Sequence, residues 1–507
     1  MNNMVDEKAQ SLGILQVDFS GADTVVTTAN RKMRKQIERA YEREVKHERV
    51  NYIPGPRYAS DGKGARRKFN LRGSLKIFGR KQRITTFTMA AAYPFTASST
   101  HGVPGACIGV DEEGGGAFYF DPWELYAAGI IKGMSAVVLG SVGMGKSTCV
   151  KSTTSRLVLS GRKATVMSDK KGEWDIVAAY LGGNTITVGA GSETRINVLD
   201  EGNRPSYDTK KRPMTDKKWA KTVATRRLTL LRALAEILEE RRLSSAEIKA
   251  LSFGLRQAVA VAEGQGRVPI IPDFIEAIAS PDFEALGSKN DSPKVRQAFE
   301  TLYDTFTRLI DGDLEGMFDG ESTVTFDANA PIVTFNTQSL DDLPEEARKI
   351  AFACIQSWAE AAITSGDFGK RLVIYEEGSE VLNDPGSLRR MVSQWKLARA
   401  YGIFNILVLH KLGDLDLAGD AGSKTRADAY SLLGDSAVRI VYHQESDQKA
   451  LAKETLGLTE REWQRVTNFK TGQGLWKLSN DSFVVRNTMT APEVPIFNTD
   501  QKIKTAA

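Results

Sequence analysis

Short apolar runs alternate with helical patterns over much of the chain. The runs SAVVLG (135–140), ATVMSD (164–169) and TITVG (185–189) are short and rich in apolar and β-branched residues, which is typical of buried strands. Helical patterns begin at Lys146 and cover DIVAAYL between these runs. Strands that alternate with helices in this way predict a parallel sheet with helices on its faces. The fold class is therefore α/β.

The alternation stops between residues 204 and 320, where helical patterns dominate. The longest are WAKTVATRRLTLLRALAEILEE (219–240) and AEIKALSFGLRQAVAVAEG (246–264), and a third runs on from about Val295. Ser244 followed by Glu247 is a capping-box pair that would open the second helix. We therefore expect an all-helical insertion that interrupts the α/β region.

Strand signals return after the insertion and continue toward the end of the chain. Strands are predicted over STVTFD (322–327), PIVTFNT (331–337), RLVIYE (371–376), FNILVLH (404–410) and AVRIVYH (437–443), with helices from Pro344, over 388–401 and over 423–434. Two short helices and a hairpin of GLWKLSN with SFVVRN close the pattern. The chain is thus divided into an accessory segment (1–88), a first core part (89–203), the insertion (204–320) and a second core part with a C-terminal hairpin (321–507).

The accessory segment is strongly basic. Arg31–Arg83 contains 18 Lys and Arg against 5 Asp and Glu, and subtracting this excess of 13 from the whole-chain net charge of +5 leaves −8 for the remainder. Aromatic residues (Tyr41, Tyr52, Tyr58 and Phe69) are interspersed among the basic ones. Such a stretch suits DNA, through the nucleic-acid backbone, and it suits an anionic membrane surface. A solvated tail is the third interpretation, and the sequence does not choose among them.

Composition narrows the class of protein. The 507 residues are 41% hydrophobic and 26% charged, which is ordinary for a soluble globular chain, and no apolar run approaches the ~18 residues of a membrane helix. Only three cysteines and four histidines occur, at no ligand-like spacing, which argues against a disulfide scaffold and a zinc site. The start, MNNMVDEKAQSLG, has no secretory pattern. We expect a cytoplasmic protein, with peripheral attachment to the inner face of the cell membrane left open.

A phosphate-binding motif lies between the first predicted strand of the core and the helix after it. GSVGMGKS (140–147) matches G-x-x-x-x-G-K-[ST] in full, the P-loop pattern in which backbone amides surround a phosphate. Lys146 would reach the β- and γ-phosphates, and the Ser147 hydroxyl would ligate Mg²⁺. The predicted nucleotide-binding residues are Gly140, Ser141, Val142, Gly143, Met144, Gly145, Lys146, Ser147 and Thr148.

A P-loop needs acidic partners at the end of another strand, and one strand offers two. Leu372–Tyr375 is apolar and is followed by Glu376 and Glu377. Glu376 would hold the Mg²⁺ shell, a position more often occupied by aspartate, and Glu377 would polarise the attacking water. The alternative is a pair of solvated glutamates at a strand end. ATP and Mg²⁺ are therefore the expected cofactors of an ATPase.

With these motifs in place, the chain from about residue 90 to 490 resembles the conjugation-type ATPases that energise type IV secretion systems, within the FtsK–HerA group of P-loop motors. The resemblance extends over AAYPF, HGVPGACIGVD and FYFDPWE before the P-loop, residues 168–200 and 312–343, and LLGDSAVRIVYHQ, LGLTEREW and GQGLWKL near the end. Val198 replaces the proline of the family's Asn-Pro-Leu-Asp, and His410 stands where the family's sensor motif has a glutamine. This histidine is similar to that of actinobacterial relatives.

The resemblance implies a RecA-like P-loop ATPase core that works as a ring, usually a hexamer, with secretion-channel subunits as partners. In such rings an arginine of one subunit completes its neighbour's site. Arg399, before the sensor strand, and Arg426, after it, are rival candidates for this arginine. His410 would contact the γ-phosphate or its water, unless it is a structural histidine at a strand end. Glu173 is a candidate for coupling the site to the ring, unless it only favours a helix N-terminus.

Three functions remain open on the sequence. The first is an ATP-hydrolysing motor that powers a conjugative, type IV secretion-like transfer apparatus. The second is a DNA-pumping coupling ATPase of the same group, although the membrane helices usual in such proteins do not appear. The third is an ATP-binding assembly subunit with little turnover, which Glu376 and His410 suggest. The intact Lys146, Ser147 and Glu377 favour an active enzyme.

Overall fold

The computed structural model describes residues 101–189, 191–208, 212–287, 292–364, 369–382, 385–413, 415, 423–445 and 448–497. The chain divides into two units, Met1–Pro94 and Phe95–Ala507, and every described residue belongs to the second. The predicted accessory segment, with the basic stretch Arg31–Arg83, lies outside the described residues. Its proposed DNA or membrane contacts therefore stay predictions.

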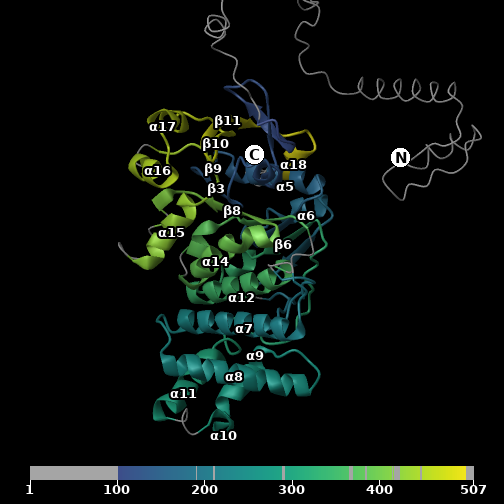
Figure 1. Ribbon diagram of the computed structural model, residues 1–507, viewed down its shortest axis with the longest axis vertical. Coiled ribbons are helices and arrows are strands. Elements are labelled where there is room, and N and C mark those ends of the chain that lie inside the picture. The colour runs from purple at the N-terminus through teal and green to yellow at the C-terminus, as the bar shows by residue number, and fades with distance from the viewer. Residues whose placement is uncertain are drawn as a thin grey trace, which may run out of the picture. The chain divides into compact units, whose positions relative to one another are not determined.

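One eleven-stranded sheet organises the described residues (Figure 1). Its parallel part runs in the order β9 (Val438–Val441), β3 (Ser135–Leu139), β8 (Ile403–Leu409), β7 (Arg371–Tyr375), β4 (Lys163–Asp169), β6 (Ile332–Asn336) and β5 (Asn184–Thr187). Beyond β9 the sheet continues with the antiparallel strands β10 (Gln473–Leu478), β11 (Asp481–Asn487), β1 (Ala106–Asp111) and β2 (Ala117–Phe120). This confirms the predicted α/β class and the mostly parallel sheet.

The central strands are buried along their whole length. Every residue of β3, β6, β7 and β8 is buried. Helices cover both faces of a parallel sheet, and its strands are therefore apolar without alternation.

Helices connect the parallel strands. The connecting helices are α5 (Lys146–Leu159), α6 (Asp175–Tyr180), α12 (Glu345–Ile363), α14 (Pro385–Tyr401) and α15 (Lys424–Gly434). Short elements are α4 (Pro122–Ala127), η1 (Gln338–Leu340), α13 (Gly378–Leu382), α16 (Lys449–Leu456), α17 (Glu460–Val466) and α18 (Glu493–Phe497).

A group of helices interrupts the sheet between β5 and β6. It consists of α7 (Asp216–Leu238), α8 (Ser245–Gly264), α9 (Ile271–Ala279), α10 (Phe283–Leu286) and α11 (Pro293–Thr307). Helix α7 packs against α12 and α14 of the core, and α8, α9 and α11 pack on one another below it in Figure 1. The all-helical insertion is thus confirmed, as is the capping box of Ser244 and Glu247. Helices α9 and α10 were not predicted.

The strand predicted over 322–327 is wrong. This segment forms no strand and lies as a loop beside residues 195–197. The Thr323 amide donates to the Arg195 carbonyl at 3.0 Å, and the Ser322 hydroxyl accepts from the Asn197 amide at 2.8 Å. Side-chain oxygens of serine and threonine here take hydrogen bonds that a ladder would otherwise make. The alternating pattern of β-branched residues was therefore misleading.

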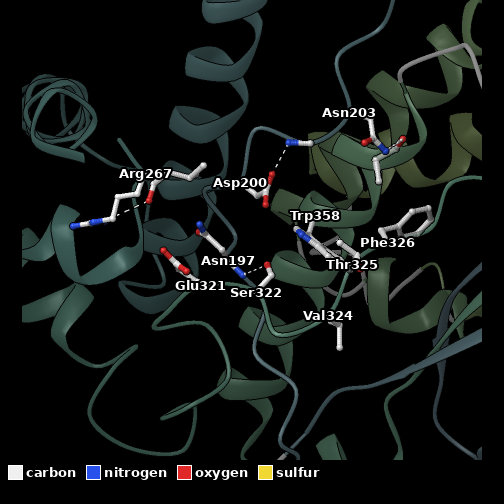
Figure 2. A pocket seen from close by; sticks show the side chains of 13 residues that line it. Asn197, Asp200, Asn203, Arg267, Glu321, Ser322, Val324, Thr325, Phe326 and Trp358 are labelled. Atoms are coloured by element: carbon white, nitrogen blue, oxygen red, sulfur yellow. Dashed lines mark hydrogen bonds between the residues drawn. The ribbon is translucent and has the colours of Figure 1, made fainter. Parts of the chain in front are cut away.

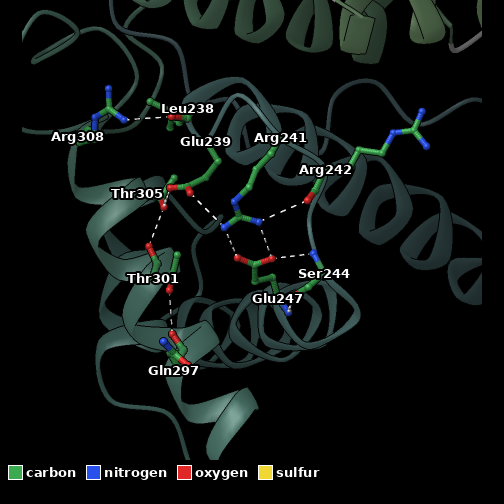
Figure 3. Close-up of polar contacts among 10 residues, drawn as sticks. All are labelled: Leu238, Glu239, Arg241, Arg242, Ser244, Glu247, Gln297, Thr301, Thr305 and Arg308. Carbon is green, nitrogen blue, oxygen red and sulfur yellow. Dashed lines mark hydrogen bonds and ion pairs between the residues drawn. The ribbon is translucent and has the colours of Figure 1, made fainter. Parts of the chain in front are cut away.

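A network of charged side chains fixes the turn between α7 and α8 (Figure 3). Arg241 donates to both carboxylate oxygens of Glu247, at 3.0 and 2.6 Å, and to Glu239 at 3.1 Å. Glu239 in turn accepts from the Thr305 hydroxyl of α11 at 2.7 Å. The hydrogen bonds from Arg241 lower the pKa of Glu247 to about 2, against the smaller effect of burial, with further help from Ser244. One carboxylate thus serves as helix cap and ion-pair partner.

We predict that Glu247→Gln destabilises the insertion by about 1–2 kcal/mol at neutral pH, because a charge-assisted pair becomes a neutral one. The folded-state pKa lies below its usual 4.5, so this contribution is present above pH 4.5 and is lost as the pH falls toward 2. Thermal unfolding of wild type and variant between pH 7 and 3 measures it. Glu345→Gln, in the Lys349–Glu345 pair whose carboxylate is exposed, is the control and should change stability by less than about 0.5 kcal/mol. Equal effects of the two substitutions would contradict the prediction.

Candidate functional site

The loop that carries the phosphate-binding motif joins the end of β3 to the start of α5. Gly143 and Gly145 have φ angles of +78° and +96°, in the left-handed region that glycine adopts without strain. Gly145 caps α5 without a side-chain hydrogen bond to the first helical amides. Those amides therefore point outward from the helix start, where a phosphate is bound in P-loop proteins.

Neighbouring segments hold this loop in place. The Ser141 amide donates to the carbonyl of His443, just past β9, at 2.9 Å. The Met144 carbonyl accepts from the Gly472 amide, just before β10, at 3.0 Å. A Cβ on Gly140 would lie 2.4 Å from Cβ of Tyr442, so only glycine fits there. The loop is therefore fixed from outside as well as by its own sequence.

Lys146 and Ser147 occupy the first turn of α5. Lys146 is 5% exposed, and its Nζ donates to the carbonyls of Gly140 and Ser141 at 2.5 and 3.0 Å. The ammonium thus lies over its own loop, where it reaches oxygen acceptors. The Ser147 hydroxyl lies near enough to Glu376 to oppose the rise in the pKa of that carboxyl. The two predicted Mg²⁺ ligands are therefore neighbours, although they are more than 200 residues apart in sequence.

Glu376 follows β7 directly, at the edge of the sheet where the parallel strands end. Its Oε2 atom is buried and has no hydrogen-bond partner among the described residues. Burial raises the pKa of Glu376, and the Ser147 hydrogen bond and the charge of Lys151 oppose this rise. A buried carboxylate oxygen beside a hydroxyl provides the hard oxygen ligands that Mg²⁺ prefers. Among the described residues, no cluster of three acidic, histidine or cysteine side chains could hold a metal ion.

Glu377 and His410 form a second pair at the same edge. The distance between Nε2 of His410 and Oε1 of Glu377 is 3.3 Å, and the Ser379 hydroxyl donates to the same oxygen at 3.4 Å. Burial alone would raise the pKa of Glu377, but the His410 hydrogen bond and the charges of His410, Lys170 and Lys171 lower it overall. The glutamate is therefore held ionised, as an acceptor for a proton of water must be.

The end of β4 adds residues that the sequence analysis missed. Asp169, 2% exposed, accepts from the amides of Lys171, Glu173 and Trp174. Lys151, with a fully buried side chain, pairs with Glu173 at 2.6 Å. Two signals were available: Asp169 follows an apolar strand, and Lys151 lies one helical turn after Ser147. Glu173, for which the sequence left a coupling role and a helix N-terminus open, is thus the ion-pair partner of Lys151.

The two arginine candidates lie in different places. Arg399 is exposed in the last turn of α14, just before β8 begins at Ile403. Strand β8 spans roughly 20 Å, so Arg399 lies at the opposite edge of the sheet from the P-loop of its own chain. Arg426 lies in the first turn of α15, after the site-bearing end of β8, with its guanidinium 5.8 Å from the centre of the Tyr430 ring.

A separate cavity of about 420 Å³ lies at the junction of insertion and core (Figure 2). Its lining includes Asp200, Arg267, Glu321 and Trp358 and none of the residues of the phosphate-binding motif. The loop segment 322–326 contributes to one wall. This junction cavity is therefore distinct from the candidate site at the strand ends.

Comparison with known proteins supports the fold. No protein-family model matches the chain, and no curated protein sequence matches it. Among solved structures, VirB4 of Thermoanaerobacter pseudethanolicus is 18% identical over 78% of this chain and 100% of the other, with a TM-score of 0.63. The plasmid coupling protein TrwB, in complex with the non-hydrolysable ATP analogue ADPNP, is 14% identical over 82% and 96% of the two chains, with a TM-score of 0.47. The described core therefore has the fold of VirB4.

We predict that Gly145→Ala weakens binding of ATP by about tenfold or more, because the added methyl group lies 3.3 Å from the Gly472 amide nitrogen and imposes strain at φ +96°. Gly161→Ala is the matched control: its φ is +89° and nothing lies within 4 Å of the new Cβ. Both variants should lose about 1 kcal/mol of stability, and only the first should lose affinity. Calorimetric titration and thermal unfolding measure the two quantities. Equal ATP affinity in both variants would contradict the assignment of this loop.

Proposed function

We propose that the protein is an ATP-hydrolysing motor that powers a conjugative, type IV secretion-like transfer apparatus. The observation that carries the proposal is the convergence of three elements at one sheet edge. These are the glycine loop before α5, the contact of Ser147 with Glu376, and the pairing of Glu377 with His410. Phosphoryl transfer to water needs a phosphate cradle, a metal shell and a water-positioning acid. The likeness of the fold to VirB4 supports the choice of apparatus.

The residues divide the chemistry among them. The loop amides and Lys146 bind the β- and γ-phosphates, and Lys146 exchanges its contacts with two loop carbonyls for phosphate oxygens. Ser147 and Glu376 would hold Mg²⁺, which neutralises charge on the phosphates. Glu377 orients water and accepts its proton, and His410 fixes the orientation of the carboxylate through the 3.3 Å contact. Thr148 continues the first turn of α5 behind Ser147.

In a ring of copies, an arginine of one copy would supply positive charge to the site of its neighbour. Because Arg399 lies at the far edge of its own sheet, it acts only on the site of a neighbouring copy, where an arginine stabilises transition-state charge. Arg426 is the alternative. We therefore propose self-association, as a hexameric ring, with secretion-channel subunits as further partners. Arg31–Arg83 would bind DNA or an anionic membrane surface. No described helix is long and apolar enough to cross a membrane.

ATP turnover by the purified protein, measured with and without DNA, tests the function. Turnover that DNA does not stimulate supports a secretion motor. Turnover that depends on DNA indicates instead a DNA-pumping coupling ATPase. ATP binding without turnover, at any protein concentration that permits a ring, indicates an ATP-binding assembly subunit and contradicts the proposed function.

Lys146→Ala should abolish hydrolysis and weaken ATP binding, because the ammonium that pairs with the β- and γ-phosphates is removed. Phosphate release and ATP titration measure the two effects. Lys163→Ala, at the amino end of β4 and bonded to the Ala328 carbonyl, is the control and should keep wild-type turnover. Normal hydrolysis by the Lys146 variant would remove the P-loop from the mechanism.

Glu377→Gln should keep ATP and Mg²⁺ binding while turnover falls by ~10²-fold or more, because a general base acts mainly in the transition state. Glu376→Gln should instead raise the Mg²⁺ concentration needed for half-maximal turnover. Bound nucleotide is compared with the turnover number for both variants. If the Glu376 variant alone traps ATP without hydrolysis, the two roles are exchanged. If both hydrolyse ATP normally, the catalytic acids lie elsewhere.

A further inference from the structure

A fully buried lysine lies on the phosphate-binding helix, one turn beyond the P-loop. Lys151 has no exposed side-chain area, and its Nζ lies 2.6 Å from Oε2 of Glu173. Burying an ammonium group is costly unless it is paired, so an aliphatic side chain would be expected at this place in a helix core. The buried charge therefore calls for an explanation beyond packing.

Lys151 and Ser147 share one face of α5. They are four residues apart, which places them one above the other on a helix. Ser147 contacts Glu376 at the end of β7, and Lys151 contacts Glu173 after the end of β4. Strands β7 and β4 are neighbours in the sheet. One face of the phosphate-binding helix is thus attached to two adjacent strand ends.

Several contacts hold the β4–α6 turn, residues 169–175, in place. The Asp169 carboxylate accepts from its backbone amides. Asp175 accepts from the side-chain amide of Asn336, the last residue of β6, at 2.6 Å. Gly172, with φ +64°, lies so close to Gln338 and Asn336 that a Cβ would be 3.2–3.3 Å from their side chains. The contact with the phosphate-binding helix comes from Glu173, and Lys151 is its ion-pair partner.

The same turn carries positive charge to the water-positioning acid. Lys170 and Lys171 both act on Glu377, whose pKa their charges help to lower. Lys170 also lies 3.5 Å from Asp341. A shift of the turn would move both ammonium groups relative to Glu377, at the place where negative charge develops as the γ-phosphate is attacked.

We propose that Lys151 is a positioning residue that acts through Glu173 to hold the β4–α6 turn, and with it Lys170 and Lys171, beside Glu377. The inference rests on the proposed ATP hydrolysis and adds a role for Lys151, whose side chain has no exposed area, and for its partner Glu173. The loop amides and Lys146, which would bind the nucleotide, belong to the P-loop and the start of α5 and not to this turn. Removing the pair should therefore lower kcat and leave nucleotide affinity unchanged.

The decisive variant is the double substitution Lys151→Met/Glu173→Gln. Each single change leaves one charge of the pair without its partner, whereas the double variant removes both charges and keeps the side-chain volumes. A purely structural pair then predicts wild-type stability and wild-type kcat. A positioning pair predicts wild-type stability and wild-type affinity for ADP with Mg²⁺, with kcat lowered by about tenfold or more. Lys163→Met, at the opposite end of β4, is the matched control and should keep the wild-type kcat.

The full-length protein is assayed for ATP turnover, for binding of ADP with Mg²⁺ and for thermal unfolding. A selective loss of kcat in the double variant supports the inference. A kcat equal to that of wild type overturns it, and so does a parallel loss of kcat and ADP affinity, which would mean that the pair acts on the P-loop itself. If the wild-type protein binds ADP and shows no turnover, the proposed function fails, and this inference fails with it.

Discussion

The candidate site depends on the burial of polar and charged side chains along one helix. Helix α5 is covered by the sheet and its neighbours, and its buried residues include Lys146, Lys151, Ser152, Thr153 and Thr154. Buried polar groups need partners. Lys146, Lys151 and Ser152 have partners in three other segments. The first turn reaches the P-loop carbonyls and Glu376, and the second reaches Glu173. Because these contacts occur together, the P-loop, Glu376 and the β4–α6 turn have one relative position.

Polar contacts with other segments also hold the carboxyl end of α5. Arg156 donates to both oxygens of Glu493 in α18, at 2.8 and 2.6 Å, and to the carbonyls of Cys107 and Thr488. Asn487 of β11 donates to the Ser152 hydroxyl at 3.0 Å. The first and last strands of the core are thus joined to the phosphate-binding helix. The antiparallel part of the sheet therefore supports the candidate site although Ser147 and Glu376 both lie outside it.

Local features of the sequence predicted much of this site, and long-range pairing explains what was missed. The P-loop, the strand before it and the acids after β7 can each be recognised from a few consecutive residues. Because parallel strands end at the same edge of a sheet, these residues are expected to lie at one edge. Lys151 and Glu173 are separated by 22 residues, and a lysine in a helix is normally expected to be solvated. The strand prediction for 322–327 failed because the pattern of β-branched residues there is local, whereas the hydrogen bonds of the segment are made with residues 195–197. Residue patterns do not contain such tertiary contacts.

The return strand of the insertion links the helical part of the molecule to the site. The chain leaves the core after β5 and returns through β6, and these strands pair with each other at one edge of the sheet. Asn336, the last residue of β6, donates to Asp175, and Gln338 lies against Gly172. Both contacts fall on the turn that carries Lys170 and Lys171. The end of β6 is therefore in direct contact with this turn, which the Lys151–Glu173 pair joins to α5. The β4–α6 turn is thus in contact both with the strand that returns from the insertion and with the helix that follows the P-loop.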